Sequence, residues 1–248
     1  MIQTWIADVT PLMNTTDNTI YTQYLCKLPT WRREKATRFK SIADKALSVG
    51  AWTLYEQANA KYGQIQTFNL SHSGKYALCS FLCNRKILYY TKTLRGRRTR
   101  LIGRTLGAES LRADSLFPAK VCKIGCDVQR VKEVKDSLAK RFFTENEHTY
   151  VMQGKTKQER NERICRLWAL KESFAKATGE GLRIGLANFD VGFDEMNRPV
   201  LLEQPKQVQE VYYFREYSLE NENYQIAVCA SVNQFADAIE VVKLDVRL

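Results

Sequence analysis

Three side chains recur at steps of four residues along a stretch that we predict to be a long helix. They are Trp168, Glu172 and Lys176, and at about 100° per residue they form one stripe. The expected core face lies nearly opposite and comprises Ile164, Leu167, Leu170, Phe174 and Ala177. A solvated face with an ordinary Glu–Lys pair is the alternative. Because a large aromatic is unusual on a fully exposed face, we expect this stripe to meet something other than bulk water.

A carboxylate and an amide lie two residues apart at the end of a predicted strand. Asp127 and Gln129 point to the same side of such a strand, and Gly125 lets another backbone or a ligand approach closely. A strand-end Asp is often only a turn former. Combined with Glu172 from the helix, however, these side chains make an oxygen-only set of the kind that suits Mg²⁺ with phosphate oxygens completing the shell.

One of the two histidines lies among small hydrogen-bonding residues, in the run Asn69-Leu70-Ser71-His72-Ser73-Gly74. Neighbouring residues on a strand point to opposite sides, so Ser71 and His72 do not form the nucleophile–base pair of a hydrolase. Hydroxyls, a glycine and an imidazole in one turn better suit an anion cradle whose donors face a phosphate. A structural histidine is the alternative.

Strands and helices alternate along the chain and must position these residues. One helix is predicted over about 157–178, stopped by Gly179 and Gly181, and another over about 32–60. Strands are predicted at about 1–9, 68–74, 76–83, 121–128, 189–193, 211–217 and 224–232. The pattern is mixed α and β in two halves, 1–119 and 120–248, that divide near Ala119.

Composition excludes several classes of protein. The 248 residues are 44% apolar with 12 Gly and 5 Pro, which excludes a disordered or collagenous chain. No run approaches the roughly 20 apolar residues of a membrane helix, and the N-terminus lacks the features of a signal peptide. We therefore expect a cytoplasmic globular protein without a membrane association.

Seven scattered cysteines do not indicate a disulfide framework. Two C-x3-C pairs, Cys79/Cys83 and Cys122/Cys126, raise the alternative of a zinc site. Both pairs lie in apolar, strand-like runs, and structural zinc sites usually show tighter spacing. Buried thiols are therefore the favoured interpretation.

Five runs occur in a fixed order along the chain. They are residues 68–74 (FNLSHSG), 125–129 (GCDVQ), 141–147 (RFFTENE), 167–176 (LWALKESFAK) and 224–230 (YQIAVCA). Together they resemble the signature of the 4′-phosphopantetheinyl transferase superfamily, in its surfactin-synthetase-activating (Sfp-type) branch. The resemblance covers most of the chain apart from residues 84–120, and the ordered motifs are specific although each alone is weak.

This resemblance implies an α/β (α+β) fold, a pseudo-dimer of two similar α/β subdomains with the active site in the cleft between them. The implied reaction moves 4′-phosphopantetheine from coenzyme A to a serine of an acidic acyl or peptidyl carrier protein, releases 3′,5′-ADP and requires Mg²⁺. A monomer is expected from the pseudo-dimeric architecture. Because the nucleophile belongs to the partner, the enzyme needs no nucleophile of its own.

The resemblance also assigns roles to individual residues. The implied metal ligands are Asp127, Glu172 and, in the third position, Gln129. Lys176 would neutralise the diphosphate or protonate the leaving group, and either Glu172 or Glu147 would remove the serine proton. The remaining contacts to coenzyme A are Ser71 and His72 for the phosphates, and Arg32 and Lys35 for the 3′-phosphate.

Two departures from the family pattern motivate a second hypothesis. Gln129 replaces an acidic residue, which removes one negative charge from the metal site. The run 62–65 (YGQI) lacks the Lys and Pro of an upstream Gly-Lys-Pro element. A catalytically degenerate homologue that still binds coenzyme A or the carrier protein would explain both departures.

A block of eight basic residues without any Asp or Glu lies between positions 84 and 104. The net charge of the chain is +11, and the block accounts for all but +3 of it. The block belongs to an insertion at about 84–120, for which a disordered loop, a docking surface for an acidic carrier protein and a nucleic-acid contact compete. Only two aromatics accompany the charges, so a nucleic-acid-binding module ranks last.

Overall fold

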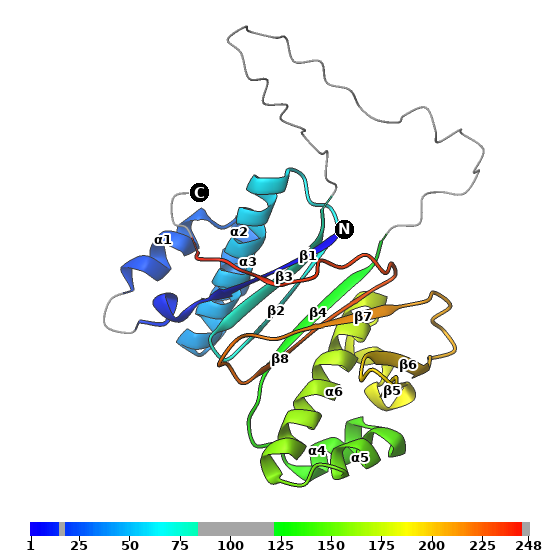
Figure 1. Cartoon of the computed structure of the whole chain (residues 1–248). Helices are drawn as coiled ribbons and strands as arrows, with labels where there is room; N and C mark the ends of the chain where they lie inside the picture. The colour runs from blue at the N-terminus through cyan, green and yellow to red at the C-terminus, as the bar shows by residue number, and fades with distance from the viewer. Residues whose placement is uncertain (15–17, 84–121, 245–248) are drawn as a thin grey trace, which may run out of the picture. The chain divides into compact units, whose positions relative to one another are not determined.

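The computed structural model describes residues 1–14, 18–83 and 122–244. Its N-terminal part is a sheet of β1 (Ile2–Asp8), β2 (Phe68–Ser73) and β3 (Tyr76–Leu82), in the antiparallel order β2-β3-β1 (Figure 1). The short strand β9 (Glu240–Val241) adds in parallel to β1. Three helices precede the hairpin: α1 (Thr19–Lys27), α2 (Thr30–Thr37) and α3 (Ile42–Tyr62), of which α3 packs against the sheet.

The C-terminal part repeats this plan with additions. Its sheet contains β4 (Ile124–Arg130), β7 (Tyr213–Tyr217) and β8 (Tyr224–Ala230), in the antiparallel order β4-β8-β7. The long helix α6 (Lys157–Thr178) packs against β4 and β8. The additions are α4 (Asp136–Phe142), α5 (Glu145–Met152) and a separate hairpin of β5 (Asp190–Phe193) and β6 (Pro199–Glu203).

The same order of elements therefore occurs twice. A first strand, a long helix and a hairpin follow one another as β1-α3-β2-β3 and as β4-α6-β7-β8, and in both sheets the last strand of the series is central. This duplication agrees with the prediction of two similar α/β halves. The predicted boundary between them at residue 119, like the basic insertion, lies outside the described residues.

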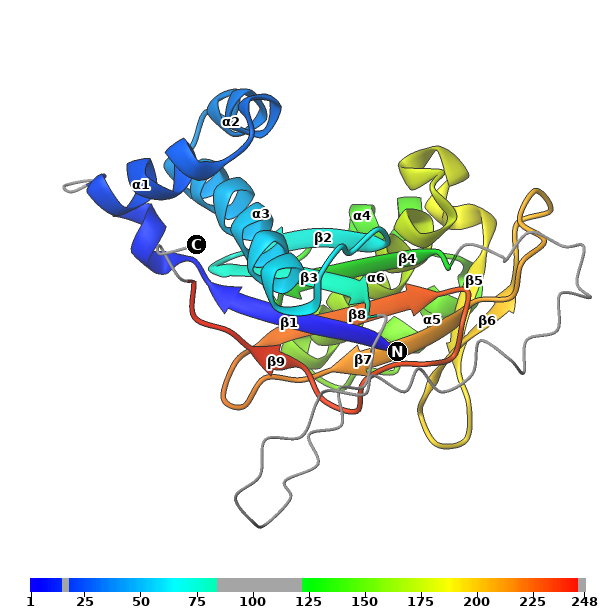
Figure 2. The ribbon, with the colours of Figure 1, turned by 90° about the horizontal axis from the view of Figure 1, so that it is seen from above.

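Apolar side chains from both sheets form a shared core. Ile6 and Leu78 from the first sheet pack in one cluster with Val128 and Val228 from the second. Separate clusters lie beneath the helices on the outer faces, with Leu54 of α3 in one and Leu167 of α6 in another. The layers thus run helix, sheet, sheet, helix, and β2 and β4 lie side by side where the sheets meet (Figure 2).

A predicted helix was confirmed where residues at both of its ends mark where it begins and stops. Helix α6 spans the predicted residues because Thr156 accepts a hydrogen bond from the backbone N–H of Glu159 at its start and Gly179 takes a left-handed φ of 80° at its end. The single helix predicted over 32–60 was wrong, since the chain forms α2 and then α3. The hydroxyl of Ser41 caps the second helix by accepting from the backbone N–H of Asp44 at 3.0 Å.

Other boundaries differ by a few residues. The strand predicted at 121–128 begins at Ile124 and continues to Arg130, and the short elements α1, α4, α5, β6 and β9 were not predicted. The four cysteines of the C-x3-C pairs are buried, as the apolar runs indicated. Across the described residues, every helix is too short or too polar to cross a bilayer.

Candidate active site

A close contact between two backbones positions the candidate site. A Cβ atom on Gly125 of β4 would lie 2.0 Å from the carbonyl oxygen of Ser173 and 2.3 Å from the amide nitrogen of Ala177, both on α6. Any larger residue would therefore push the helix away from the strand. This contact confirms the expected close approach at Gly125, and it brings the polar stripe of α6 to the residues that follow Gly125 on β4.

The carboxylate of Asp127 is the centre of the resulting hydrogen-bond network. Its Oδ1 accepts from Lys176 Nζ at 2.7 Å and from Ser71 Oγ at 2.7 Å. Its Oδ2 accepts from Gln129 Nε2 at 2.7 Å. Strands β2 and β4 and helix α6 each supply a partner, so four residues singled out in the sequence meet at one point. Asp127 is buried, whereas the side chain of Lys176 retains 26% of its exposure.

Glu172 lies one helical turn before Lys176 on α6, so both side chains project from the same face of the helix. Burial and then the negative charge of Asp127 raise the pKa of Glu172, while Lys176 opposes the shift. Lys176 has a raised pKa because the charge of Asp127 and a hydrogen bond to it outweigh the opposite effect of burial. Two carboxylates that repel each other beside an amide form a donor set that fits a hard divalent cation.

That fit rests on two acids and one amide. Among the described residues, His, Cys, Asp and Glu side chains do not gather in groups of three or more at a common point. The Gln129 amide donates to Asp127, so its oxygen would reach a cation only after the amide turned over. Asp127 and Glu172 are thus the carboxylates available to a cation, and Gln129 is a weaker third candidate.

Alternate side chains of β2 connect the two sheets. The Oδ1 atom of Asn69 accepts from the backbone N–H of Cys126 at 3.1 Å, and Ser73 Oγ accepts from the backbone N–H of Arg130 at 3.1 Å. Ser71, between them, donates to Asp127. In this structure the Ser71 hydroxyl therefore links β2 to β4, and its contact with a phosphate stays a prediction.

His72 lies on the other side of β2. It is exposed where Ser71 is buried, as the alternation along a strand predicts. Partial desolvation and then repulsion from Lys176 lower the pKa of His72. The imidazole is therefore a neighbour of the Asp127 network without a hydrogen bond to Ser71, and it is free to meet a ligand from the solvent side.

Arg32 and Lys35 lie on α2, apart from this network. Arg32 is buried, with its guanidinium 4.9 Å from the ring centroid of Trp52, and it donates to the carbonyl of Ser48 at 3.2 Å. Its Nε atom has no hydrogen-bond partner, and burial lowers its pKa. Lys35 is exposed. The role of these two side chains toward a 3′-phosphate stays a prediction.

Glu147 occupies a second, fully buried charged site. It pairs with Lys171, and the side chains of both residues are 0% exposed. The same carboxylate accepts from the backbone N–H groups of Val191 and Thr144, each at 2.9 Å. A base must reach the proton that it removes. This burial therefore makes Glu147 an unsuitable base, although the sequence offered it as one of two candidates.

The Lys171–Glu147 pair was not predicted from the sequence. Lys171 lies four residues after Leu167, on the side of α6 that carries the apolar stripe, and a lysine there needs a buried partner. Trp168, by contrast, behaves as expected of an aromatic on the other stripe. Its ring lies 5.2 Å from that of Phe142 and 6.5 Å from that of Phe143.

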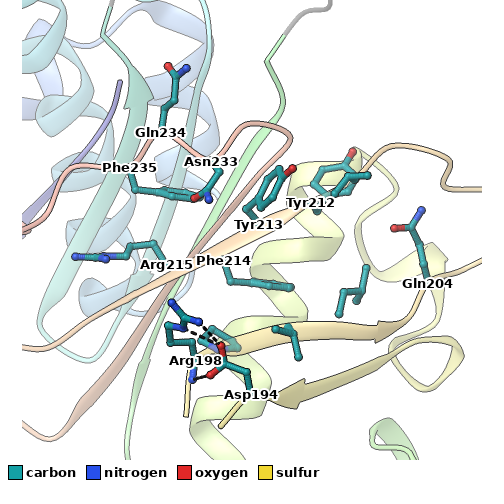
Figure 3. Close-up of a pocket in the computed structure, with 14 residues that line it drawn as sticks. Asp194, Arg198, Gln204, Tyr212, Tyr213, Phe214, Arg215, Asn233, Gln234 and Phe235 are labelled. Atoms are coloured by element: carbon teal, nitrogen blue, oxygen red, sulfur yellow. Dashed lines mark hydrogen bonds and ion pairs between the residues drawn. The ribbon is translucent and has the colours of Figure 1, made fainter. Parts of the chain in front are cut away.

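A separate hollow of about 660 Å³ lies between the β5–β6 hairpin, β7 and the segment at 233–235 (Figure 3). Arg198 and Asp194 form an ion pair at its rim. None of the residues predicted for the site lines this hollow. We therefore place the candidate chemistry at the junction of β2, β4 and α6.

Comparison with known proteins finds similarity to one family. Residues 123–229 match the family model described as 4'-phosphopantetheinyl transferase superfamily. The curated 4'-phosphopantetheinyl transferase Sfp of Bacillus subtilis (strain 168) is 28% identical over 178 residues, which cover 72% of this chain and 61% of that protein. The 4'-phosphopantetheinyl transferase ffp of Bacillus subtilis is 33% identical over 125 residues, 50% of this chain and 54% of that protein.

A shorter relative and a solved structure were also found. The holo-[acyl-carrier-protein] synthase of Thermotoga maritima is 33% identical over 120 residues, 47% of this chain and 66% of that protein. The crystal structure of holo-[acyl-carrier-protein] synthase from Neisseria meningitidis is similar at a TM-score of 0.36 and 22% identity. The match covers 44% of this chain and 95% of the synthase chain. This chain spans about half to three fifths of the length of the first curated relatives.

Proposed function

We propose that this protein transfers 4′-phosphopantetheine from coenzyme A to a serine of an apo carrier protein, since residues 123–229 match the model of the 4′-phosphopantetheinyl transferase superfamily. The proposed reaction breaks the diphosphate of coenzyme A and releases 3′,5′-ADP. The observation that carries the proposal is the meeting of Asp127, Lys176 and Ser71, with Glu172 beside them, between the two halves of the fold.

We assign metal binding to the two acids of this group. Asp127 and Glu172 would hold Mg²⁺, with Gln129 as an additional oxygen ligand if its amide turns over. When bound, Mg²⁺ supplies positive charge to the diphosphate oxygens. Ser71 and Gln129 fix the orientation of the Asp127 carboxylate through the hydrogen bonds that they donate to it.

Donors on the solvent-exposed side of the Asp127 network would bind the diphosphate of coenzyme A. Lys176 is partly exposed and carries a positive charge, because its pKa is raised. The solvent-facing imidazole of His72 supplies a further donor. Arg32 and Lys35 on α2 stay as candidates for the 3′-phosphate. Positioning and charge neutralisation of this kind account for most of the catalysis of phosphoryl transfer.

Glu172 is the base that we favour for the reaction. It would take the proton of the carrier serine, directly or through water, while the serine oxygen bonds to the phosphorus that carries pantetheine. The bond from that phosphorus to the bridging oxygen breaks, and the leaving 3′,5′-ADP keeps the electron pair. A raised pKa makes Glu172 a better proton acceptor than an ordinary carboxylate. Glu147 acts at a distance, by anchoring Lys171 inside α6.

We further propose that the carrier protein is acidic. The chain has a net charge of +11, and eight of its basic residues lie within 84–104. A positive surface raises the association rate of a negatively charged partner. The type of carrier, whether for fatty acids, polyketides or peptides, would be read from the set of carriers that the protein modifies.

Intact-mass spectrometry of apo carrier proteins tests this function directly. Carriers incubated with the protein, coenzyme A and Mg²⁺ should gain the mass of one phosphopantetheine, and EDTA should abolish the gain. Asp127→Asn removes the charge at the centre of the site, while Glu203→Gln makes the same type of change on an exposed residue of β6. The first variant should be inactive and the second fully active.

A folded protein that binds coenzyme A but modifies no carrier would instead favour the catalytically degenerate homologue. The replacement Gln129→Glu would then test the cause, because it restores the acid that the family pattern has at this position. A gain of transfer in that variant would locate the defect at Gln129.

A further inference from the structure

Three side chains of the protein donate hydrogen bonds to the Asp127 carboxylate. Oδ1 accepts from Lys176 and Ser71, and Oδ2 accepts from Gln129. The side chain of Asp127 is only 4% exposed. Oδ1 already accepts two hydrogen bonds, so a divalent cation that binds through this oxygen must replace Lys176 or Ser71, since a donor hydrogen and a metal compete for the same oxygen lone pairs.

Lys176 is the donor whose displacement matters most. Its Nζ lies 2.7 Å from Asp127 Oδ1, 3.1 Å from the carbonyl oxygen of Cys126 and 3.2 Å from Ser71 Oγ. These three acceptors use all three donors of an ammonium group. Lys176 also interacts favourably with Glu172. It is therefore the internal cation of the site, balancing the two carboxylates that a metal would bind.

The side chain of Lys176 is also able to leave. It is 26% exposed where Asp127 is 4% exposed, and the four-carbon stem of a lysine is flexible. Lys171, five residues earlier on α6, is 0% exposed and held by the carbonyl of Phe189 at 2.7 Å as well as by Glu147. Of the two lysines, only Lys176 has solvent on one side into which the ammonium can move.

We propose that Lys176 competes with the divalent cation for Asp127, so that binding of the cation releases the ammonium group to the diphosphate. This inference rests on the proposed function for the identity of the two ligands. Its consequence is a coupling between them: the metal makes Lys176 available to the phosphate oxygens, and a phosphate that holds Lys176 leaves Asp127 open to the metal. Lys176 is thus both an inhibitor of metal binding and a contact for the substrate.

The competition predicts that removing the charge of Lys176 raises the affinity of the protein for the divalent cation. Two cations on one carboxylate repel each other strongly at separations of a few ångström in a partly buried site. Lys176→Met should therefore bind Mg²⁺ or Mn²⁺ at least about tenfold more tightly than the unmodified protein. A residue with a merely structural role would show the opposite, because its loss would loosen the site and weaken metal binding.

Isothermal titration calorimetry with Mg²⁺ or Mn²⁺ alone measures this effect without coenzyme A or a carrier. The full chain, Lys176→Met and Lys176→Gln would be compared with Lys206→Met, which makes the same change at an exposed lysine. Both Lys176 variants should bind the metal more tightly, and Lys206→Met should bind as the full chain does. Lys176→Gln keeps a donor toward Asp127, so it serves if Lys176→Met fails to fold.

Equal or weaker metal binding by the folded Lys176 variants would overturn the competition. Asp127→Asn separates this failure from a failure of the proposed site. If that variant binds the metal as well as the full chain does, the metal lies elsewhere and both proposals are wrong. If Asp127→Asn loses the metal while the Lys176 variants gain nothing, the metal site stands and the competition alone is wrong.

Discussion

Helix α6 carries two lysine–carboxylate pairs five residues apart, and their surroundings differ sharply. Lys171 and Glu147 are 0% exposed, and backbone groups of three other residues complete their hydrogen bonds. Lys176 and Asp127 lie where two sheets meet, and Lys176 is 26% exposed. The first pair holds α5 and β5 against the helix. The second is reachable by a ligand, and the comparison shows that burial and backbone partners decide which role a charged pair can take.

The largest expected effect comes from breaking the Lys176–Asp127 pair, which a ligand can reach. Asp127→Asn should lower phosphopantetheine transfer by at least about a thousandfold, because preorganised charge is the main source of catalysis in phosphoryl transfer. The fold should survive, since an amide of the same shape can still accept from Lys176 and Ser71. Transfer rates on a purified carrier and the circular dichroism spectrum measure the two expectations. A variant that retains activity would refute the assignment of Asp127.

The corresponding change in the buried Lys171–Glu147 pair should lower the free energy of unfolding. Glu147→Gln leaves the charge of Lys171 in the core without a counter-charge, which typically costs about 3–5 kcal/mol. Urea denaturation followed by tryptophan fluorescence would measure the loss. A stable Glu147→Gln protein without activity would contradict this prediction and return Glu147 to the list of candidate bases.

Removing both charges of the buried pair sharpens the comparison. Glu147→Leu combined with Lys171→Met should be at least about 2 kcal/mol more stable than Glu147→Gln alone, because no uncompensated charge remains in the core. It should not exceed the unmodified protein, since the backbone N–H groups of Thr144 and Val191 lose their acceptor. A double variant as unstable as the single one would show that these backbone contacts dominate.

The smallest expected effect is a pH dependence of stability that Glu172 causes beside the Lys176–Asp127 pair. The pKa of Glu172 is raised by burial and by Asp127, so the folded metal-free protein binds this proton more tightly than the unfolded chain does. The contribution of Glu172 to the free energy of unfolding therefore falls as the pH rises from about 4.5, the ordinary value, past the raised pKa of the folded protein. Glu172→Gln should raise the melting temperature of the metal-free protein at pH 7 and leave it unchanged near pH 4. An equal effect at both pH values would exclude the electrostatic cause.

The parts of this molecule that were predictable from the sequence have local signals. Thr156 and Gly179 delimit α6, and the spacing of Asp127 and Gln129 places both on one side of β4. Gly125 indicated the close approach of another backbone. The break between α2 and α3 was missed because the apolar periodicity runs through it, and only the cap at Ser41 marks the new start.

Contacts between distant residues were the least predictable part of the site. The hydrogen bond from Ser71 to Asp127 joins residues 56 positions apart, and it depends on how β2 and β4 meet. The pairing of Lys171 with Glu147 likewise depends on the packing of α5 against α6. The basic segment at 84–104 lies outside the described residues, so its role stays a prediction.

The contact at Gly125 affects how mutational scans of this protein should be interpreted. Replacing each charged residue by alanine tests the groups of the site but leaves the spacing between β4 and α6 unchanged. Gly125→Ala adds one methyl group that meets the backbone of Ser173 and Ala177, so it would separate Asp127 from Glu172 and Lys176 together. Such a variant would resemble a catalytic mutant in an activity screen, although glycine itself contributes no chemical group to the reaction.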